Sequence, residues 1–389
     1  MNTPYKIGII AEWNPFHRGH EQMITKIKSD YPRSLLYATM SGSFVQRGEP
    51  ALFDKWTRAE WAVRAGIDAV FELPAFISLR SADFFAENGI ALLHLLGCHA
   101  AAFGTESLDA ESLIHAASFS GTEKYRTRFR EALDDGLSYA AASYEAMYCF
   151  SKEIAAELTK PNNLLGYKYA ETIQRCRYSM DIITVKRDMV HNISASRARE
   201  ELLTCGKSSL LSEPVSRTAS RMMAAGNCTD YTRYDDACLL LSKIIPLTQL
   251  QDSHLFSEGL EQKWKKEASR ADYADMLGHI KSKRYLYSRL KRIGANLLIG
   301  GGASVPSYTI RKESAYARLL ALNRQESQSL RNISIPVITS AAKGMRILGK
   351  DAAQSLLRDI RSTDIRAFCQ RNECFRSSNT DYYRSPVIL

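Results

Sequence analysis

Short apolar runs alternate with amphipathic stretches along the first half of the chain. Apolar or β-branched residues cluster in five runs of strand length, at 6–12, 35–41, 67–73, 99–104 and 181–187. Between these runs, apolar residues recur at helical spacing, as at 53–66 and 82–97. Strands that alternate with helices indicate βαβ units. We therefore predict a Rossmann-like α/β fold with a five-stranded parallel sheet that is buried on both faces.

The pattern changes twice farther along the chain. Residues 108–160 show no strand pattern, and we interpret them as a helical insertion. Beyond residue 205, Ser and Pro accumulate and the apolar spacing becomes helical, as at 237–247, 288–300 and 315–325. We therefore predict two domains, an α/β domain at 1–205 and a mostly helical domain at 206–389.

The composition is that of a globular protein, with 45% hydrophobic and 24% charged residues among 389. No apolar run reaches the length of a membrane span, and the first residues lack the features of a signal peptide, so we expect a cytoplasmic protein. The eight cysteines are scattered without a CxxC pair, which indicates reduced thiols and predicts no metal site.

The net charge of +10 is carried almost entirely by residues 201–389. Within that half, residues 281–292 hold six basic side chains and no acidic one. Such a run is typical of a surface that binds a polyanion, although a solvated helix face explains it equally well. The candidate cations are Lys281, Lys283, Arg284, Arg289, Lys291 and Arg292.

The first predicted strand runs into EWNPFHRGH, residues 12–20. Asn14 and Pro15 turn the chain, and Gly19–His20 begins a predicted helix. A helix N-terminus presents unpaired backbone N–H groups that bind anions, and imidazoles aimed at the same point can donate hydrogen bonds to a phosphate. A plain turn needs neither histidine, so His17 and His20 indicate chemistry at a phosphate group.

A second polar cluster follows the fifth predicted strand, in TVKRDMVHNISASRARE at 184–200. Ser194 or Ser196 can cap the next helix, and Arg199 can bind phosphate oxygens with both arms of its guanidinium. Capping alone would explain the serines, and His191 is either a further site residue or a structural histidine. Because the carboxyl ends of parallel strands meet at one edge of a sheet, we expect both clusters to share one phosphate site.

His-x-Gly-His after the first strand, with Ser-x-x-Arg at a late helix, resembles the nucleotidyltransferase superfamily. More narrowly, the chain resembles the bacterial tRNA(Met) cytidine acetate ligase family over most of its length, with the motifs in the same order. Two positions depart from the family pattern: Trp13 stands where Tyr is usual, and Ser196 replaces a Thr but keeps the hydroxyl. The matching motifs are GIIAEWNPFHRGH, MSGSFVQRGEPALFDKWTRAEWAVRAGIDAVFELP, FGTES, KPNNLLGYKY and SKRYLYSRLKR.

The resemblance implies a sheet of the nucleotidyltransferase (HUP) type and an enzyme that uses ATP, accompanied by Mg²⁺, to convert acetate into acetyl-adenylate. The acetyl group then passes to the wobble cytidine of elongator tRNA(Met), giving N(4)-acetylcytidine. It further implies that His17, His20 and Arg199 are catalytic and that the basic run binds tRNA. The implied ATP-binding residues are Ile7, Gly8, Ile9, Ile10, Ala11, Glu12, Trp13, Asn14, Pro15, Phe16, His17, Arg18, Gly19, His20, Gly104, Asn162 or Asn163, Arg187, Ser194 and Ser196.

Two other functions remain open at this point. An adenylyltransferase that joins AMP to a small phosphorylated cofactor precursor would share the site but would not need a basic helical half. A non-catalytic RNA-binding protein would not need an intact His-x-Gly-His motif. One long loop is also open to two interpretations, because its polar residues either line the acetate or cytidine pocket or satisfy one another. These residues are Ser41, Gly42, Gln46, Arg47, Asp54 and Lys55.

Overall fold

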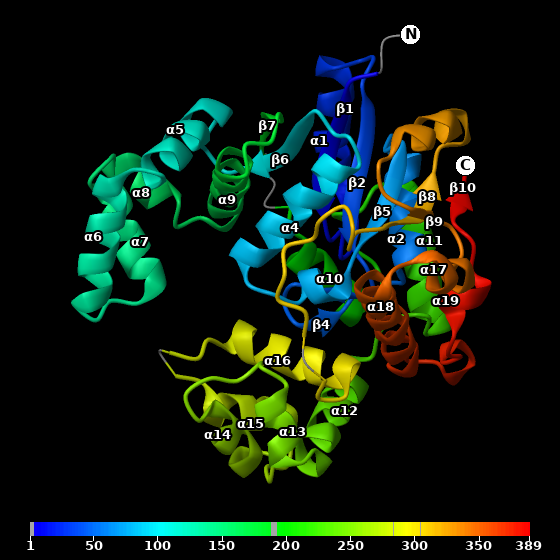
Figure 1. The fold of residues 1–389 in the computed structure, drawn as a ribbon. Coiled ribbons are helices and arrows are strands. Elements are labelled where there is room, and N and C mark those ends of the chain that lie inside the picture. Colours follow the sequence, from blue (N-terminus) through cyan, green and yellow to red (C-terminus); the bar gives the residue numbers. More distant parts are fainter. Residues whose placement is uncertain (1–3, 188–192, 283, 304) are drawn as a thin grey trace.

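A computed structural model describes residues 4–187, 193–282, 284–303 and 305–389. Its first-half sheet strands are mutually parallel, in the spatial order β5-β2-β1-β6-β7, and they confirm the α/β fold class (Figure 1). Strand β2 is buried at all seven of its residues because helices cover both faces of the sheet. The bounds are β1 (Lys6–Ala11), β2 (Leu35–Ser41), β5 (Ala69–Leu73), β6 (Ala100–Thr105) and β7 (Asp181–Lys186).

Two sets of helices cover the sheet. One face carries α1 (Arg18–Asp30), α2 (Lys55–Arg64), α10 (Ala195–Cys205) and α11 (Glu213–Ala225). The other face carries α3 (Ala75–Ser78), α4 (Ala82–Leu95), α5 (Ala110–Ser120) and α9 (Pro161–Arg175). A Cβ atom at Gly89 of α4 would lie 2.7 Å from the Ile10 side chain. Glycine at this position therefore allows α4 to pack directly on β1.

The predicted insertion at 108–160 is helical. After α5 it contains α6 (Glu123–Asp134), α7 (Tyr139–Tyr148) and α8 (Lys152–Glu157), which lie to one side of the sheet in Figure 1. Each of these three helices begins at a hydroxyl residue whose side chain accepts a hydrogen bond from the backbone, and these residues are Thr122, Ser138 and Ser151. The helix starts are therefore set by local capping.

The helices that follow α11 enclose a hydrophobic core of their own. Trp264 and Leu290 are fully buried within it. The predicted helical patterns at 237–247 and 288–300 correspond to α12 and α16. The bounds are α12 (Tyr231–Ile244), α13 (Leu247–Asp252), α14 (Leu260–Glu267), α15 (Tyr273–Ile280) and α16 (Tyr287–Gly300).

The helix expected at 315–325 is wrong. Residues 317–322 form strand β8 (Ala317–Leu322), which pairs antiparallel with β5 and is buried at every position. Periodicity alone does not distinguish a buried strand from a buried helix, and here the contact with β5 decides the conformation. β9 (Val337–Ile338) and β10 (Val387–Ile388) then pair parallel with β8.

These three strands bring the main sheet to eight. The division at residue 205 stays a prediction, with the difference that strands from the second half extend the sheet of the first. The remaining C-terminal elements are η1 (Arg324–Asn332), α17 (Ala341–Ile347), α18 (Lys350–Phe368), η2 (Glu373–Phe375) and α19 (Thr380–Tyr383).

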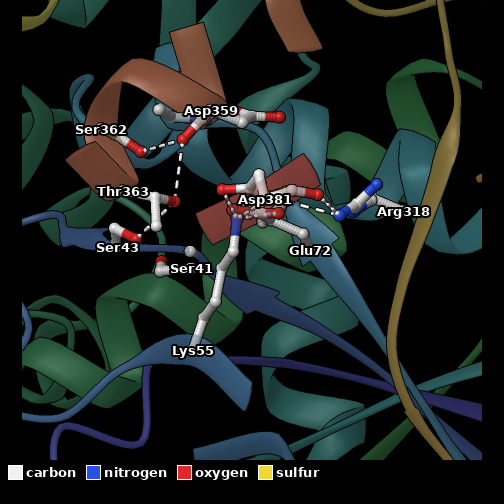
Figure 2. Close-up of polar contacts among 12 residues, drawn as sticks. Ser41, Ser43, Lys55, Glu72, Arg318, Asp359, Ser362, Thr363 and Asp381 are labelled. Carbon is white, nitrogen blue, oxygen red and sulfur yellow. Dashed lines mark hydrogen bonds and ion pairs between the residues drawn. The ribbon is translucent and has the colours of Figure 1, made fainter. Parts of the chain in front are cut away.

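A buried ionic cluster ties the C-terminal segment to the sheet (Figure 2). The Lys55 ammonium lies 2.8 Å from a Glu72 carboxylate oxygen and 2.9 Å from Asp381, and Arg318 lies 3.3 Å from Asp381. All four side chains are at most 1% exposed. Because Glu72 lies next to the end of β5 and Lys55 begins α2, the cluster fixes α19 and β8 to the edge of the sheet where the strands end.

The described residues contain no helix that is both long and apolar enough to cross a membrane.

Candidate active site

A cavity of about 870 Å³ opens at the carboxyl ends of β1, β6 and β7, between the N-termini of α1, α9 and α10. Polar and charged side chains from these separate elements meet there, as expected when parallel strands end at one edge. Both clusters singled out in the sequence line it. The predicted site residues on its wall are Ile9, Ile10, Ala11, Glu12, Trp13, Asn14, His17, Gly19, His20, Gly104, Asn162, Arg187, Ser194, Ser196 and Arg199.

Six predicted ATP-binding residues are not among the residues that line the cavity. Ile7 and Phe16 are buried in the hydrophobic core beneath it. A Cβ at Gly8 would lie 2.6 Å from Leu93, so this glycine accommodates α4. The Arg18 side chain turns away and donates a hydrogen bond to the Leu211 carbonyl at 3.1 Å. The remaining two are Pro15 and Asn163.

Asn162 and Asn163 have different surroundings. Asn163 is fully buried, and its Oδ1 accepts hydrogen bonds from the backbone N–H groups of Glu106 and Ser107. It therefore shapes the loop after β6. Asn162 lines the cavity and donates from its Nδ2 to Glu106 Oε1 at 2.5 Å. Of the two alternatives, Asn162 is the one placed to contact a ligand.

The His-x-Gly-His turn orients both imidazoles. His17 is the N-cap of α1, and its backbone N–H donates to Nδ1 of His20 at 3.1 Å. Because Nδ1 of His20 accepts this bond, a neutral His20 carries its proton on Nε2. The two rings stack with their centroids 3.6 Å apart. A Cβ at Gly19 would lie 3.2 Å from the His17 ring, so the glycine makes room for this stack.

Both histidines are neutral at pH 7. Burial, reinforced by the positive charge of Arg187, lowers the pKa of His17 to about 4. Burial also lowers the pKa of His20 well below its usual value, with smaller contributions from His17 and Arg187. Each neutral imidazole keeps one N–H that can donate a hydrogen bond, and the fixed positive charge on this part of the wall belongs to Arg187 and Arg199.

The second cluster begins α10. Ser194 is its N-cap and accepts a hydrogen bond from the Arg197 backbone N–H at 3.3 Å, so this serine does cap the helix. Ser196 lines the cavity one position into the helix. Arg199 donates to the Asn14 carbonyl at 2.6 Å and thereby joins α10 to the turn after β1. His191 lies outside the described residues.

In the long loop after β2, some of the predicted residues line the cavity and others have structural roles. Gln46 and Arg47 line the cavity, and the Gln46 backbone N–H donates to Glu12 Oε1 at 2.7 Å. Asp54 instead caps α2, where it accepts from the Thr57 backbone N–H at 2.9 Å. The other three residues satisfy structural roles or are buried, and these are Ser41, Gly42 and Lys55.

Several cavity residues were not identified from the sequence. Gln22, Met23 and Lys26 reach the cavity from α1. They follow Gly19 at spacings of three, four and seven residues, so a helical-face projection from the His-x-Gly-His motif would have found them. Phe85, Phe103 and Tyr169 form an aromatic wall of the cavity. They come from three separate elements, so no local sequence pattern predicts this wall.

The predicted tRNA-binding residues lie at and before the start of α16. Lys281 and Arg284 are exposed, and Arg284 pairs with Glu258. Arg289 donates to Ser257 Oγ at 2.9 Å. Lys291 is less available because it pairs with Glu49 at 3.1 Å. Arg292 is half-buried, and burial lowers its pKa. Lys283 lies outside the described residues.

A parallel sheet whose first strand runs into two stacked imidazoles at a helix N-terminus defines a nucleotidyltransferase. The family model described as HIGH Nucleotidyl Transferase matches residues 5–381. The tRNA(Met) cytidine acetate ligase of Listeria welshimeri is 30% identical over 98% of each chain. That of Acetivibrio thermocellus is 28% identical over 98% of this chain and 99% of the relative. The chain belongs to the tRNA(Met) cytidine acetate ligase family of nucleotidyltransferases.

A solved structure shares the whole fold. Thermotoga maritima TmcAL bound with alpha-thio ATP has a TM-score of 0.90 against this chain and 25% sequence identity, over 99% of both chains. The apo form of the same protein matches equally well, with a TM-score of 0.90. The similarity therefore extends to the C-terminal strands as well as to the five-stranded core.

Proposed function

We propose that this chain is a cytoplasmic ATP-dependent acetate ligase. It forms acetyl-adenylate from acetate and ATP and transfers the acetyl group to the wobble cytidine of elongator tRNA(Met), giving N(4)-acetylcytidine. One observation carries the proposal: the two imidazoles, the N-termini of α1 and α10, and Arg187 with Arg199 line one cavity. The relatives that bear this activity in their name match the chain over nearly its full length.

The first step needs little covalent help from the protein. An acetate oxygen attacks the α-phosphorus of ATP in line, a new oxygen–phosphorus bond forms, and the bond to the bridging oxygen breaks to release diphosphate. Negative charge on the departing diphosphate increases during this step. His17 and His20 would donate hydrogen bonds to the phosphates, while Arg187 and Arg199 neutralise charge. Because stacking and hydrogen bonds within the protein hold these groups in place, little reorganisation would be required.

In the second step, the exocyclic amine of cytidine attacks the acetyl carbonyl. The carbon–oxygen bond to AMP breaks, the new amide forms, and the amine loses a proton. Adenylation makes this possible because AMP is a far better leaving group than oxide. The cavity must therefore admit a base from the RNA as well as a nucleotide.

Mg²⁺ would enter with ATP. The parts of the chain that the structure describes bring together no group of three metal-binding side chains. The ion would therefore be coordinated mainly by the phosphate oxygens, where it neutralises their charge and orients them. We assign it no protein ligand.

The basic segment favours an RNA acceptor over the small phosphorylated acceptor of an adenylyltransferase. Lys281, Arg284 and Arg289 lie at or near the surface ahead of and within the first turns of α16. Cations of this kind bind the RNA backbone without reading its sequence. A small cofactor precursor would have no use for them.

The test is incorporation of radiolabelled acetate into acid-precipitable tRNA in the presence of ATP. We expect labelling by the wild type and none by His20→Ala, with the tRNA dissociation constant of the variant within twofold of the wild type. His115→Ala is the matched control because this exposed histidine lies on α5, outside the residues that line the cavity. Labelling by His20→Ala at the wild-type rate would refute the catalytic assignment. Transfer of AMP to a small phosphorylated acceptor, without acetate dependence, would favour the adenylyltransferase.

A further inference from the structure

A short hairpin separates the cavity from the basic helix α16. It consists of β3 (Phe44–Val45) and β4 (Glu49–Pro50), joined by a turn at 46–48. Its cavity side is held by the hydrogen bond from the Gln46 backbone to Glu12. Gln46 and Arg47 both line the cavity. The turn is therefore part of the wall of the site.

The other side of the hairpin packs on the helical half of the chain. Gly48 has φ +77, and a Cβ there would lie 2.5 Å from the Arg292 backbone nitrogen, so only glycine allows α16 to approach this closely. The Tyr234 hydroxyl donates to the Gly48 carbonyl at 2.9 Å. Phe44 packs edge-on against the Tyr234 ring, with the centroids 5.8 Å apart. These contacts give the hairpin a fixed position relative to the basic helix.

A charged residue of the hairpin, Glu49, is paired with cations on two other elements. Glu49 lies 3.1 Å from the Lys291 ammonium and 3.7 Å from the Arg199 guanidinium, so one carboxylate connects α16 to the catalytic cluster. Arg47 is exposed, and within the described residues its side chain has no hydrogen bond, ion pair or ring contact. A cation without a hydrogen bond or ion pair therefore stands on the cavity wall, one residue from the contact with α16. Its positive charge also acts on the buried Glu12 carboxyl, where it favours the charged form.

We propose that Arg47 binds a backbone phosphate of the RNA beside the nucleotide whose base enters the cavity. This inference rests on the proposed function. RNA held on the exposed cations Lys281 and Arg284, just ahead of α16, must cross the hairpin to deliver a base to the cavity. A base that leaves its stack carries its flanking phosphates with it, and a planar guanidinium binds a phosphate through two parallel hydrogen bonds. Arg47 thus positions the acceptor nucleotide, while Lys291 and Arg199 remain paired with Glu49.

The test measures tRNA binding by fluorescence anisotropy over a range of salt concentrations, without ATP or acetate. A single lost phosphate contact lowers the slope of log affinity against log salt by about 0.7–0.9. For Arg47→Gln we expect that change in slope, with affinity at low salt reduced by about 5–10-fold, of the order given by one charge-assisted contact. Arg47→Lys should keep the slope because it keeps the charge. It should recover only part of the affinity because an ammonium cannot donate the two parallel hydrogen bonds of a guanidinium. Arg64→Gln is the control, since Arg64 lies on α2 and, in the part of the chain that the structure describes, pairs only with Glu60.

Two results would overturn the inference. One is a salt slope for Arg47→Gln equal to that of the wild type. The other is a rise in the KM of Arg47→Gln for ATP that is as large as its loss of tRNA affinity, measured by acetate-dependent ATP–diphosphate exchange without RNA. Arg47 would then bind the triphosphate. The binding assay does not require turnover. Wild-type protein that binds tRNA but fails to acetylate it would refute the proposed function. The phosphate contact of Arg47 would still be tested by the slope of log affinity against log salt.

Discussion

Asp381→Asn should destabilise the protein strongly, although Asp381 lies far along the chain from the site. Asp381 is buried and contacts both Lys55, at 2.9 Å, and Arg318, at 3.3 Å. Within the described residues, the only other carboxylate on Lys55 is Glu72, at 2.8 Å. The substitution keeps the shape of the side chain and removes its charge, so two buried cations would share one carboxylate.

The neighbouring acid does not compensate for the lost charge. Burial, followed by the negative charge of Glu72, raises the pKa of Asp359 to about 8, which disfavours its charged form. Removing one partner of a buried ion pair typically costs about 3–5 kcal/mol because the remaining charge is left unpaired. We expect a loss of that size in the free energy of unfolding.

Equilibrium unfolding in urea, followed by circular dichroism, measures the effect. The control is Asp30→Asn, which breaks the ion pair with Lys26 at 2.6 Å between side chains that are 41% and 61% exposed. An exposed pair of this kind contributes about 0–1 kcal/mol. Adding Lys55→Met to Asp381→Asn should recover part of the stability because Glu72 and Arg318 then balance. The reasoning is refuted if Asp381→Asn costs no more than Asp30→Asn.

Two further predictions concern pH. The folded-state pKa of Asp359 lies above the ordinary value of 3.8, so the unfolded chain releases this proton at lower pH than the folded chain does. The contribution of Asp359 to stability therefore falls as pH rises from about 4 to about 8. Asp359→Asn should flatten the dependence of the unfolding free energy on pH in that window, and an unchanged slope would contradict the raised pKa. For His17, with a folded-state pKa of about 4 against 6.5, the stability present above pH 6.5 is lost as pH falls toward 4. His17→Gln should reduce that loss in urea titrations at pH 5 and pH 7, whereas an identical loss would show that His17 is not neutral when buried.

Local patterns were sufficient for much of the catalytic half. The run at 6–12 predicts a strand because its apolar residues have no helical period, and Asn14, Pro15 and Gly19 predict a turn and a helix start through their own backbone preferences. These cues act over a few residues, so the sequence alone places His17 and His20 at the N-terminus of α1. A cap of α10 at Ser194 or Ser196 follows in the same way, and the structure selects Ser194. The catalytic and ligand-binding roles of these residues remain predictions.

The features missed from the sequence depend on contacts between distant residues. Residues 317–322 have apolar side chains compatible with either helix or strand, and pairing with β5 makes them a strand. Asn162 and Asn163 are adjacent and chemically identical, yet packing against the loop after β6 buries only Asn163. Lys291 belongs to a basic run, but Glu49, far away in the chain, takes up its charge.

By itself, the sequence determined the order of the five strands and the helices in the first half, the turn that carries the two histidines, and the concentration of positive charge in the second half. Only the tertiary structure decided which cations are left to meet a ligand, which asparagine faces the cavity, and that the C-terminal segment closes the sheet. Secondary structure and caps depend on neighbours a few residues away, whereas burial and charge pairing depend on which distant segments the fold brings together.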